Sequence, residues 1–169
     1  TKNDTRFSKT VEYGNIVSGL PIKNETCDAI YCSHVLEHLS LEDFRIALKN
    51  SCSYLKSGGT FRLVLPDLEF SINRYHNDKS SLASLVFLRE TLLGREVSPQ
   101  GIREFIVDYL GHSKHLWMWD YRSIKKELEN AGFSNIHRCY YGDSKDKMID
   151  MVEEKNRFEN CLGVECKKN

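Results

Sequence analysis

The stretch Cys27–Asp67, CDAIYCSHVLEHLSLEDFRIALKNSCSYLKSGGTFRLVLPD, predicts a strand, a helix and a second strand in that order. Residues 28–32 (DAIYC) form a short apolar run, the pattern of a strand that is covered on both faces. Residues 60–65 (TFRLVL) form another such run, and Pro66 ends it because proline cannot donate to a strand ladder. Two neighbouring strands that are joined through a helix lie parallel in one sheet. The stretch therefore predicts the parallel part of an α/β fold.

The segment between the two strands carries the signals of an amphipathic helix. Ser40, with Asp43 three residues on, resembles a capping box that starts a helix at Leu41. Gly58–Gly59 supplies the left-handed residue that ends it. The apolar residues of this helix recur on one face: Leu41, Phe44, Leu48, Cys52 and Leu55.

Polar residues stand where each predicted strand ends. Ser33–His34 follow the first strand, and Pro66–Asp67 follow the second. In parallel sheets, ligands bind beyond the carboxyl ends of the strands. We therefore expect the functional site at this edge of the sheet.

The rest of the chain predicts further elements around this unit within a single domain, residues 1–169. Residues 76–111 look like a helical insertion, in which a helix over 81–93 turns Leu82, Leu85, Val86 and Leu92 inward. A helix over 121–130, with Asp120 as its N-cap, then leads to strands over 135–141 and 160–167. The predicted fold is a mostly parallel α/β sheet with an antiparallel C-terminal strand.

Composition bounds the function classes. The 169 residues carry 24 Lys+Arg and 24 Asp+Glu, so the formal net charge is zero, and no basic block indicates a nucleic-acid surface. No apolar run is long enough to cross a membrane. The six cysteines form no CxxC pair, which is typical of reduced, buried thiols in a cytoplasmic protein.

Several short motifs stand in an order that resembles one enzyme family. They are Gly14–Asn15, Gly19–Leu20–Pro21, Cys27–Ile30, His34–His38 (HVLEH), Leu55–Gly59, Arg62–Asp67 and Leu128…Ala131–Gly132–Phe133. Together they resemble the later half of a class I S-adenosylmethionine-dependent methyltransferase of the type 11 kind. The resemblance implies a Rossmann-like fold, S-adenosylmethionine as cofactor, and a small-molecule or saccharide acceptor.

One family feature is missing from the sequence. The family's glycine-rich turn cradles the cofactor, yet the ten glycines here form no GxG. The chain begins about where the family's third strand would stand, so we expect the N-terminal strands of the family to be missing from it. Two explanations stay open: an N-terminal segment that the sequence lacks, or a cofactor-free relative.

The resemblance assigns roles to particular residues. Asn15, with the Ile16 amide beside it, takes the place of the acidic residue that holds the adenine amino group. Ser33 and His34 would line the methionine and sulfonium region, and His38 would sit near the cofactor. These five residues are the expected cofactor-binding set.

Methyl transfer by in-line displacement needs alignment and, for a hydroxyl acceptor, a general base. His34 is the first candidate for that base, with Asp67 and His115 behind it as further catalytic candidates. His115 belongs to a segment that also holds His112, Trp117 and Trp119. The two indoles would wall a substrate pocket, mediate a homodimer contact, or anchor a buried corner.

Two other function classes compete with this interpretation. His34-x-x-Glu37-His38 matches the H-x-x-E-H pattern of zinc hydrolases, but the predicted helix starts only after His38, and no downstream glutamate stands out as a third ligand. We therefore expect no metal site. The other alternative is a non-catalytic interaction module, in which an unpaired sheet edge pairs with another chain.

Overall fold

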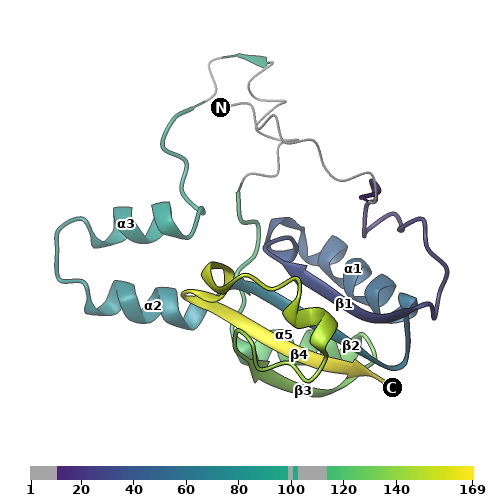
Figure 1. The fold of residues 1–169 in the computed structure, drawn as a ribbon. Helices are drawn as coiled ribbons and strands as arrows, with labels where there is room; N and C mark the ends of the chain where they lie inside the picture. The colour runs from purple at the N-terminus through teal and green to yellow at the C-terminus, as the bar shows by residue number, and fades with distance from the viewer. Residues whose placement is uncertain (1–10, 99–100, 103–113) are drawn as a thin grey trace.

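A computed structural model describes residues 11–98, 101–102 and 114–169 of the chain. Four strands form one sheet in the order β1-β2-β4-β3 (Figure 1). They are β1 (Cys27–Ser33), β2 (Leu55–Pro66), β3 (Phe133–Cys139) and β4 (Cys161–Lys168). β1 and β2 run parallel, and β4 runs antiparallel to both of its neighbours. The prediction of an α/β sheet with an antiparallel C-terminal strand is confirmed.

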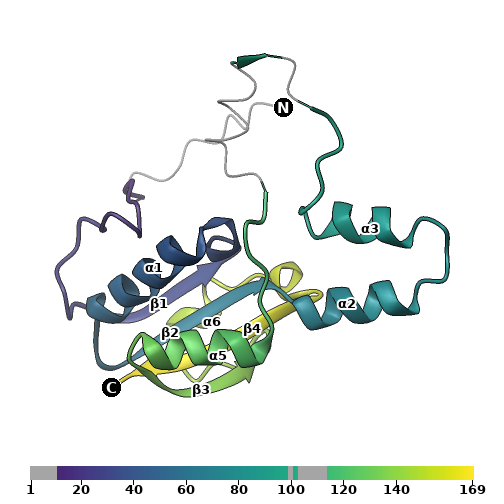
Figure 2. The same cartoon turned by 180° about the vertical axis from the view of Figure 1, so that it is seen from behind.

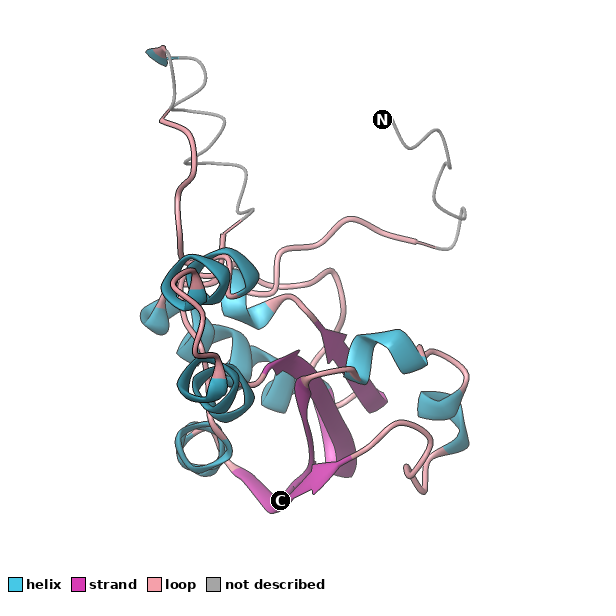
Figure 3. Cartoon of the chain, turned by 90° about the vertical axis from the view of Figure 1, so that its left-hand side faces the viewer, coloured by secondary structure: helices cyan, strands magenta, loops and turns pink. Residues whose placement is uncertain are grey.

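Helices lie on both sides of this sheet (Figures 2 and 3). α1 and α5 cover one face, and α6 lies on the other. Within the described ranges, no helix is both long and apolar enough to span a membrane. The bounds of the helical elements are η1 (Leu36–His38), α1 (Leu41–Tyr54), α2 (Leu68–Asn77), α3 (Ala83–Glu90), α5 (Tyr121–Asn130), α6 (Lys147–Asp150) and η2 (Lys155–Phe158).

The core lies between the sheet and the two helices α1 and α5. α1 starts at Leu41 as predicted, because the side chain of Ser40 accepts a hydrogen bond from the backbone N–H of Asp43. The buried stripe of this helix packs on alternate residues of β2, which point to the same face. Residues at the centre of this core have no exposed surface: Phe44, Leu48, Phe61, Leu63, Ile124 and Leu128.

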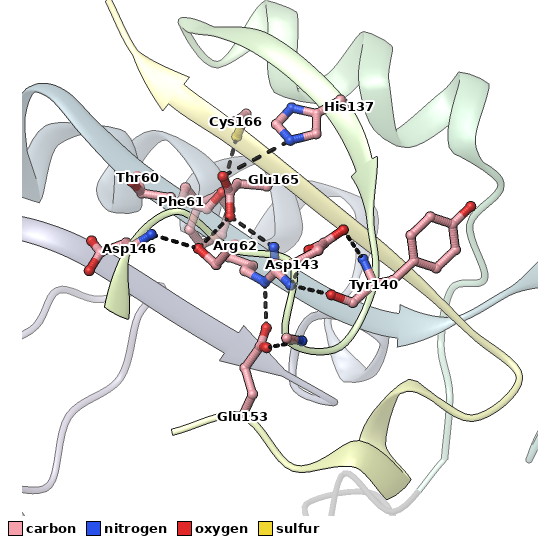
Figure 4. A network of polar contacts seen from close by, with 12 residues as sticks. Thr60, Phe61, Arg62, His137, Tyr140, Asp143, Asp146, Glu153, Glu165 and Cys166 are labelled. Carbon is pink, nitrogen blue, oxygen red and sulfur yellow. Dashed lines mark hydrogen bonds and ion pairs between the residues drawn. The ribbon is translucent and has the colours of Figure 1, made fainter. Parts of the chain in front are cut away.

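The opposite face of β2 carries a buried arginine. Arg62 is fully buried, and its guanidinium donates to Glu153, to Glu165 Oε2 at 2.9 Å and to Asp143 Oδ1 at 2.8 Å (Figure 4). The backbone carbonyl of Tyr140 takes a further hydrogen bond at 2.7 Å. The carboxylates of Glu153 and Glu165 are themselves buried. One guanidinium therefore ties the segment after β3 to the middle of the sheet.

Three expectations were wrong in detail. α1 ends at Tyr54, so Leu55 and Gly58–Gly59 belong to β2 and not to the end of the helix. β1 is half-buried along its length rather than covered on both faces, since it stands at the end of the sheet within the described residues. The leucines of the insertion do not all turn inward, because Leu82 and Leu85 are each 56% exposed. α3 packs beside α2, with the rings of Tyr75 and Phe87 5.5 Å apart, and lies on neither face of the sheet (Figure 1). Residues 99–100 and 103–111 of the predicted insertion lie outside the described residues.

The N-cap of α5 gives a first testable prediction. The Asp120 carboxylate accepts from the Ser123 backbone N–H at 2.7 Å, and this hydrogen bond lowers the pKa of Asp120. We expect Asp120→Ala to lower the free energy of unfolding by about 1 kcal/mol at neutral pH. A depressed pKa in the folded state means that this contribution is full above the ordinary aspartate pKa and is lost as pH falls through the lowered one. Urea denaturation at several pH values measures it.

Asp120→Asn is the matched control, because asparagine caps about as well as aspartate without a charge. The free energy of unfolding of Asp120→Asn should be only slightly below that of the unmodified protein. The stabilisation by the asparagine cap should not decline at low pH, because asparagine does not titrate. An Asp120→Ala deficit that stayed constant down to acidic pH would contradict the assigned role of the carboxylate.

Candidate functional site

A cavity of about 480 Å³ opens at the carboxyl ends of β1 and β2. His34 and Pro66, the residues at these two strand ends, form its floor with Cys161 from the start of β4. α2 and α3 form its walls with Phe70, Arg74, Tyr75, Phe87 and Glu90, and His115 completes them. The cavity thus lies at the edge of the sheet where the sequence places the site.

His34 is fixed at the mouth of β1 by both its backbone and its ring. Its backbone N–H donates to Val64 O at 2.9 Å, and its φ of 54° turns the chain sharply out of the strand. Ring Nε2 lies 3.0 Å from Arg157 O, and because a carbonyl can only accept, Nε2 carries a hydrogen. The sulfur of Cys161 and the carboxylate of Glu37 raise the pKa of His34 to about 10. Both ring nitrogens of His34 are therefore engaged.

Three imidazoles surround one buried carboxylate beside the cavity. Glu37 is 1% exposed, and among the described residues neither of its carboxylate oxygens accepts a hydrogen bond. Its Oε1 lies 3.4 Å from Nδ1 of His34, 3.9 Å from Nε2 of His38 and 4.0 Å from Nε2 of His115. We call Glu37, His38 and His115 the Glu37 cluster.

Backbone contacts bring His115 to this place. The carbonyl of Glu37 accepts from the N–H groups of Leu116 and Trp117, at 2.8 and 3.1 Å. His38 donates from Nδ1 to Lys114 O at 3.0 Å. The rings of His38 and His115 then meet edge to face, with centroids 5.1 Å apart. Burial lowers the pKa of His115, and the Glu37 carboxylate opposes this shift.

Asp67 lies at the end of β2, on the same edge of the sheet as His34, but its side chain accepts hydrogen bonds from backbone N–H groups. Its Oδ1 caps α2 by accepting from the N–H groups of Glu69 and Phe70, at 2.8 and 3.3 Å. Its Oδ2 faces the guanidinium of Arg138 at 3.5 Å. The cavity wall includes Pro66 but not Asp67.

The expected adenine-binding residues lie apart from the cavity. Asn15 Oδ1 accepts from the N–H groups of Val17 and Ser18, at 2.8 and 3.3 Å, so it closes a local turn. Asn50 of α1 donates a hydrogen bond from Nδ2 to the carbonyl of Ile16 at 2.7 Å. Because α1 begins beside His38 and rises about 1.5 Å per residue, this contact lies on the order of 14 Å along the helix. A ligand that touched both places would have to be extended.

Other residues of the predicted site separate in the structure. Ser33 lines a smaller hollow with Tyr31 and Arg157, and His34 is not part of that lining. Trp119 is buried and stacks on Phe44 with ring centroids 4.3 Å apart, so it anchors the core. His112 lies outside the described residues.

Sequence reasoning missed Cys161 and the role of Glu37 in this site. Cys161 reaches the cavity because it pairs with Pro66 across the β2–β4 ladder. The signal for Glu37 was its place in the H-x-x-E-H motif, but nothing in the sequence indicated that residues 114–117 return to it.

Comparison with known families identifies the class of protein. Residues 3–138 match the family model of a methyltransferase domain. This match spans most of the chain, and the chain therefore belongs to the methyltransferase domain family. No curated protein matches the chain in sequence.

Two solved structures share the fold. An S-adenosylmethionine-dependent methyltransferase from Archaeoglobus fulgidus has a TM-score of 0.51 at 16% identity, covering 94% of this chain and 66% of that one. An S-adenosylmethionine-dependent methyltransferase from Thermotoga maritima, described as a possible histamine N-methyltransferase, gives 0.50 at 16% identity, covering 92% and 62%. The chain spans less than two thirds of either protein. The resemblance to class I methyltransferases, including the Rossmann-like fold, is confirmed.

Proposed function

We propose that the protein transfers a methyl group from S-adenosylmethionine to an acceptor bound in the cavity at the ends of β1 and β2. The match of residues 3–138 to a methyltransferase domain carries this proposal. The position of the cavity supports it, because ligands of such sheets bind beyond the carboxyl ends of the strands.

Methyl transfer requires no covalent bond between the protein and the methyl group. The sulfonium supplies a strong leaving group, so the enzyme aligns the acceptor and excludes water. When the acceptor is a hydroxyl, its proton must also leave. His34 and His115 both line the cavity. Because both nitrogens of His34 already face Arg157 and Glu37, we assign orientation of the acceptor to His34 and removal of the proton to His115.

The cofactor would extend from the cavity toward α1. His34 and His38 lie at the end where the methyl group is transferred, with Ser33 next to them in the chain. Asn15 and Ile16 lie along α1, where Asn50 fixes the turn that holds them. The separation of the two groups suits an elongated nucleoside. Asp67 acts here as the cap of α2, which supplies one wall of the cavity.

The cavity favours a small polar acceptor such as a saccharide. Its volume of about 480 Å³ falls within the range of small-molecule sites. Phe70, Tyr75 and Phe87 offer aromatic surface for a sugar face, while Arg74 and Glu90 offer charged groups for its hydroxyls. Arg74 and Glu90 form an ion pair of 2.8 Å, so hydrogen-bond donors and hydrogen-bond acceptors lie together on one wall of the cavity.

Further features of the whole protein belong to the same proposal. Residues 1–169 form one methyltransferase-like domain with the segment 76–111 as its insertion. All six cysteines are free thiols, which supports a cytoplasmic location. Trp117, 41% exposed, supplies an aromatic surface for a homodimer contact.

Calorimetric titration of the 169-residue protein with S-adenosylhomocysteine tests the proposal. We expect measurable binding that Asn15→Ala and His34→Ala each abolish, because the two residues lie at opposite ends of the proposed ligand path. Lys125→Ala, an exposed change on α5, should bind as the unmodified protein does.

The outcome separates the two function classes. Circular dichroism should first show that each variant is folded. If a folded full-length protein that includes this chain failed to bind S-adenosylhomocysteine, the enzyme proposal would be contradicted and the non-catalytic interaction module favoured.

A further inference from the structure

Three potential metal ligands converge beside the cavity. One ligand atom from each member of the Glu37 cluster lies within 4.8 Å of the other two. The side chains come from the short η1 turn and from the distant segment before α5. We propose that the Glu37 cluster binds a divalent transition-metal ion through two imidazole nitrogens and one carboxylate.

The buried carboxylate is the first argument for an ion. Glu37 is 1% exposed, and within the described part of the chain its two oxygens accept no hydrogen bond. A buried carboxylate without hydrogen bonds is unfavourable unless a positive charge lies close to it. The ring of His34, whose Nδ1 lies 3.4 Å from Oε1 and whose pKa is raised, supplies one positive charge. A divalent ion would add the direct bond that the carboxylate lacks, because Oε1 also lies near the nitrogens of His38 and His115.

The orientation of His38 is the second argument. Its Nδ1 donates to the carbonyl of Lys114 at 3.0 Å, so the hydrogen sits on Nδ1. Nε2 is then the nitrogen with a free lone pair, and this atom faces Glu37 Oε1 at 3.9 Å. A metal-binding histidine usually donates its other N–H to a backbone carbonyl or a carboxylate in this way.

The spacing of the ligand atoms requires only a small adjustment. Tetrahedral coordination with bonds of about 2.1 Å separates neighbouring ligand atoms by roughly 3.4 Å. The distances from Glu37 Oε1 to Nε2 of His38 and of His115 are 3.9 and 4.0 Å. The ligand nitrogens of His38 and His115 lie within 4.8 Å of each other, so these two rings must approach by at most about 1.4 Å. A movement of about 0.7 Å by each imidazole, within the range of side-chain motion, would close the site.

The site differs from the one that the H-x-x-E-H pattern suggests. In that pattern both histidines bind zinc and the glutamate acts as a base. Here His34 directs Nε2 to Arg157 O, while His115 supplies the nitrogen that the sequence motif lacks. Two nitrogens and one carboxylate form the ligand set of open, catalytic zinc sites.

His115 also belongs to the cavity wall, so a molecule in the cavity would reach the open position of the ion. In so far as the proposed function holds, an acceptor hydroxyl would occupy that position. The ion, in place of a free imidazole, would then stabilise the oxyanion that remains when the hydroxyl proton passes to water. Metal binding itself does not depend on this step.

Titration of the metal-free protein with Zn²⁺ by calorimetry, and with Co²⁺ by visible absorption, tests the site. We expect one ion per chain, and Co²⁺ spectra without a thiolate charge-transfer band, since no cysteine belongs to the cluster. Glu37→Gln and His115→Ala should each weaken binding at least about 100-fold, because each removes a direct ligand. His137→Ala, a change of a largely exposed histidine on β3, should leave binding unchanged.

His34→Gln separates the two arrangements, because it should retain Zn²⁺ under our proposal and lose it in the H-x-x-E-H arrangement. Failure of the folded protein to bind either ion would overturn the proposal, as would binding that survives His115→Ala. If a variant fails to fold, the stoichiometry and the Co²⁺ spectrum of the unmodified protein decide. These titrations contain no methyl donor, so their failure is distinguishable from a failure of methyl transfer.

Discussion

Replacement of Arg62 by methionine is expected to lower the free energy of unfolding by about 3–5 kcal/mol, because it leaves buried carboxylates without their counter-charge. Glu153 and Glu165 both lie against the guanidinium with side chains that are almost fully buried. The backbone carbonyl of Tyr140 would lose its donor as well. Urea denaturation followed by circular dichroism measures the loss.

Arg45 provides the matched control on the surface. It binds Glu127 through two hydrogen bonds of 2.8 and 2.7 Å, but its side chain is 53% exposed. Arg45→Met should therefore have a much smaller effect than Arg62→Met, since a surface ion pair contributes little to stability and loss of the exposed Arg45 side chain opens Glu127 to water. Addition of Glu153→Gln and Glu165→Gln to Arg62→Met should recover part of the loss. Equal effects of the two arginine changes would show that burial of the Arg62 network does not matter to stability.

His115→Ala is expected to lower the rate of methyl transfer about 100-fold or more. His115 reaches both the cavity and the Glu37 cluster, so the change removes either the proton acceptor or a ligand of the proposed ion. The rate is measured as release of S-adenosylhomocysteine, with a saccharide that the unmodified protein methylates as acceptor.

Asp67→Asn distinguishes a cap from a catalytic carboxylate. Asparagine caps helices about as well as aspartate, so α2 and the cavity wall should stay in place. We expect a far smaller loss of rate than in His115→Ala. If Asp67→Asn lowered the rate as much as His115→Ala, Asp67 would have the catalytic role that its position after β2 suggests. His137→Ala, remote from the cavity, should not change the rate.

The fold was largely predictable because local signals and long-range packing agree. Ser40 and Asp120 begin helices at Leu41 and Tyr121, where their side chains accept hydrogen bonds from the backbone. The apolar run over 60–65 predicted a buried strand, and these residues do lie in β2, between β1 and β4. The insertion followed local signals less well, since the apolar residues of α3 face α2, the cavity or solvent instead of the sheet.

The candidate site was only partly predictable, because its chemistry depends on contacts between distant segments. The end of the first predicted strand indicated that His34 lies at the carboxyl edge of the sheet. Because β2 runs parallel to β1, its last residue, Pro66, lines the same cavity as His34. The approach of His115 to Glu37 depends on the backbone carbonyl of Glu37, which no side-chain pattern encodes. The engagement of Asn15 with its own turn likewise follows from local backbone geometry.

β1 terminates the sheet within the described ranges, so the hydrogen-bonding groups along its outer side have no strand beside them. A fifth strand that docked there in parallel would finish next to Ser33 and His34. The residues following such a strand would lie beside the edge of the sheet where we propose that the methyl donor binds. Affinity for the donor would then be a joint property of this chain's core and of whatever polypeptide completes its sheet.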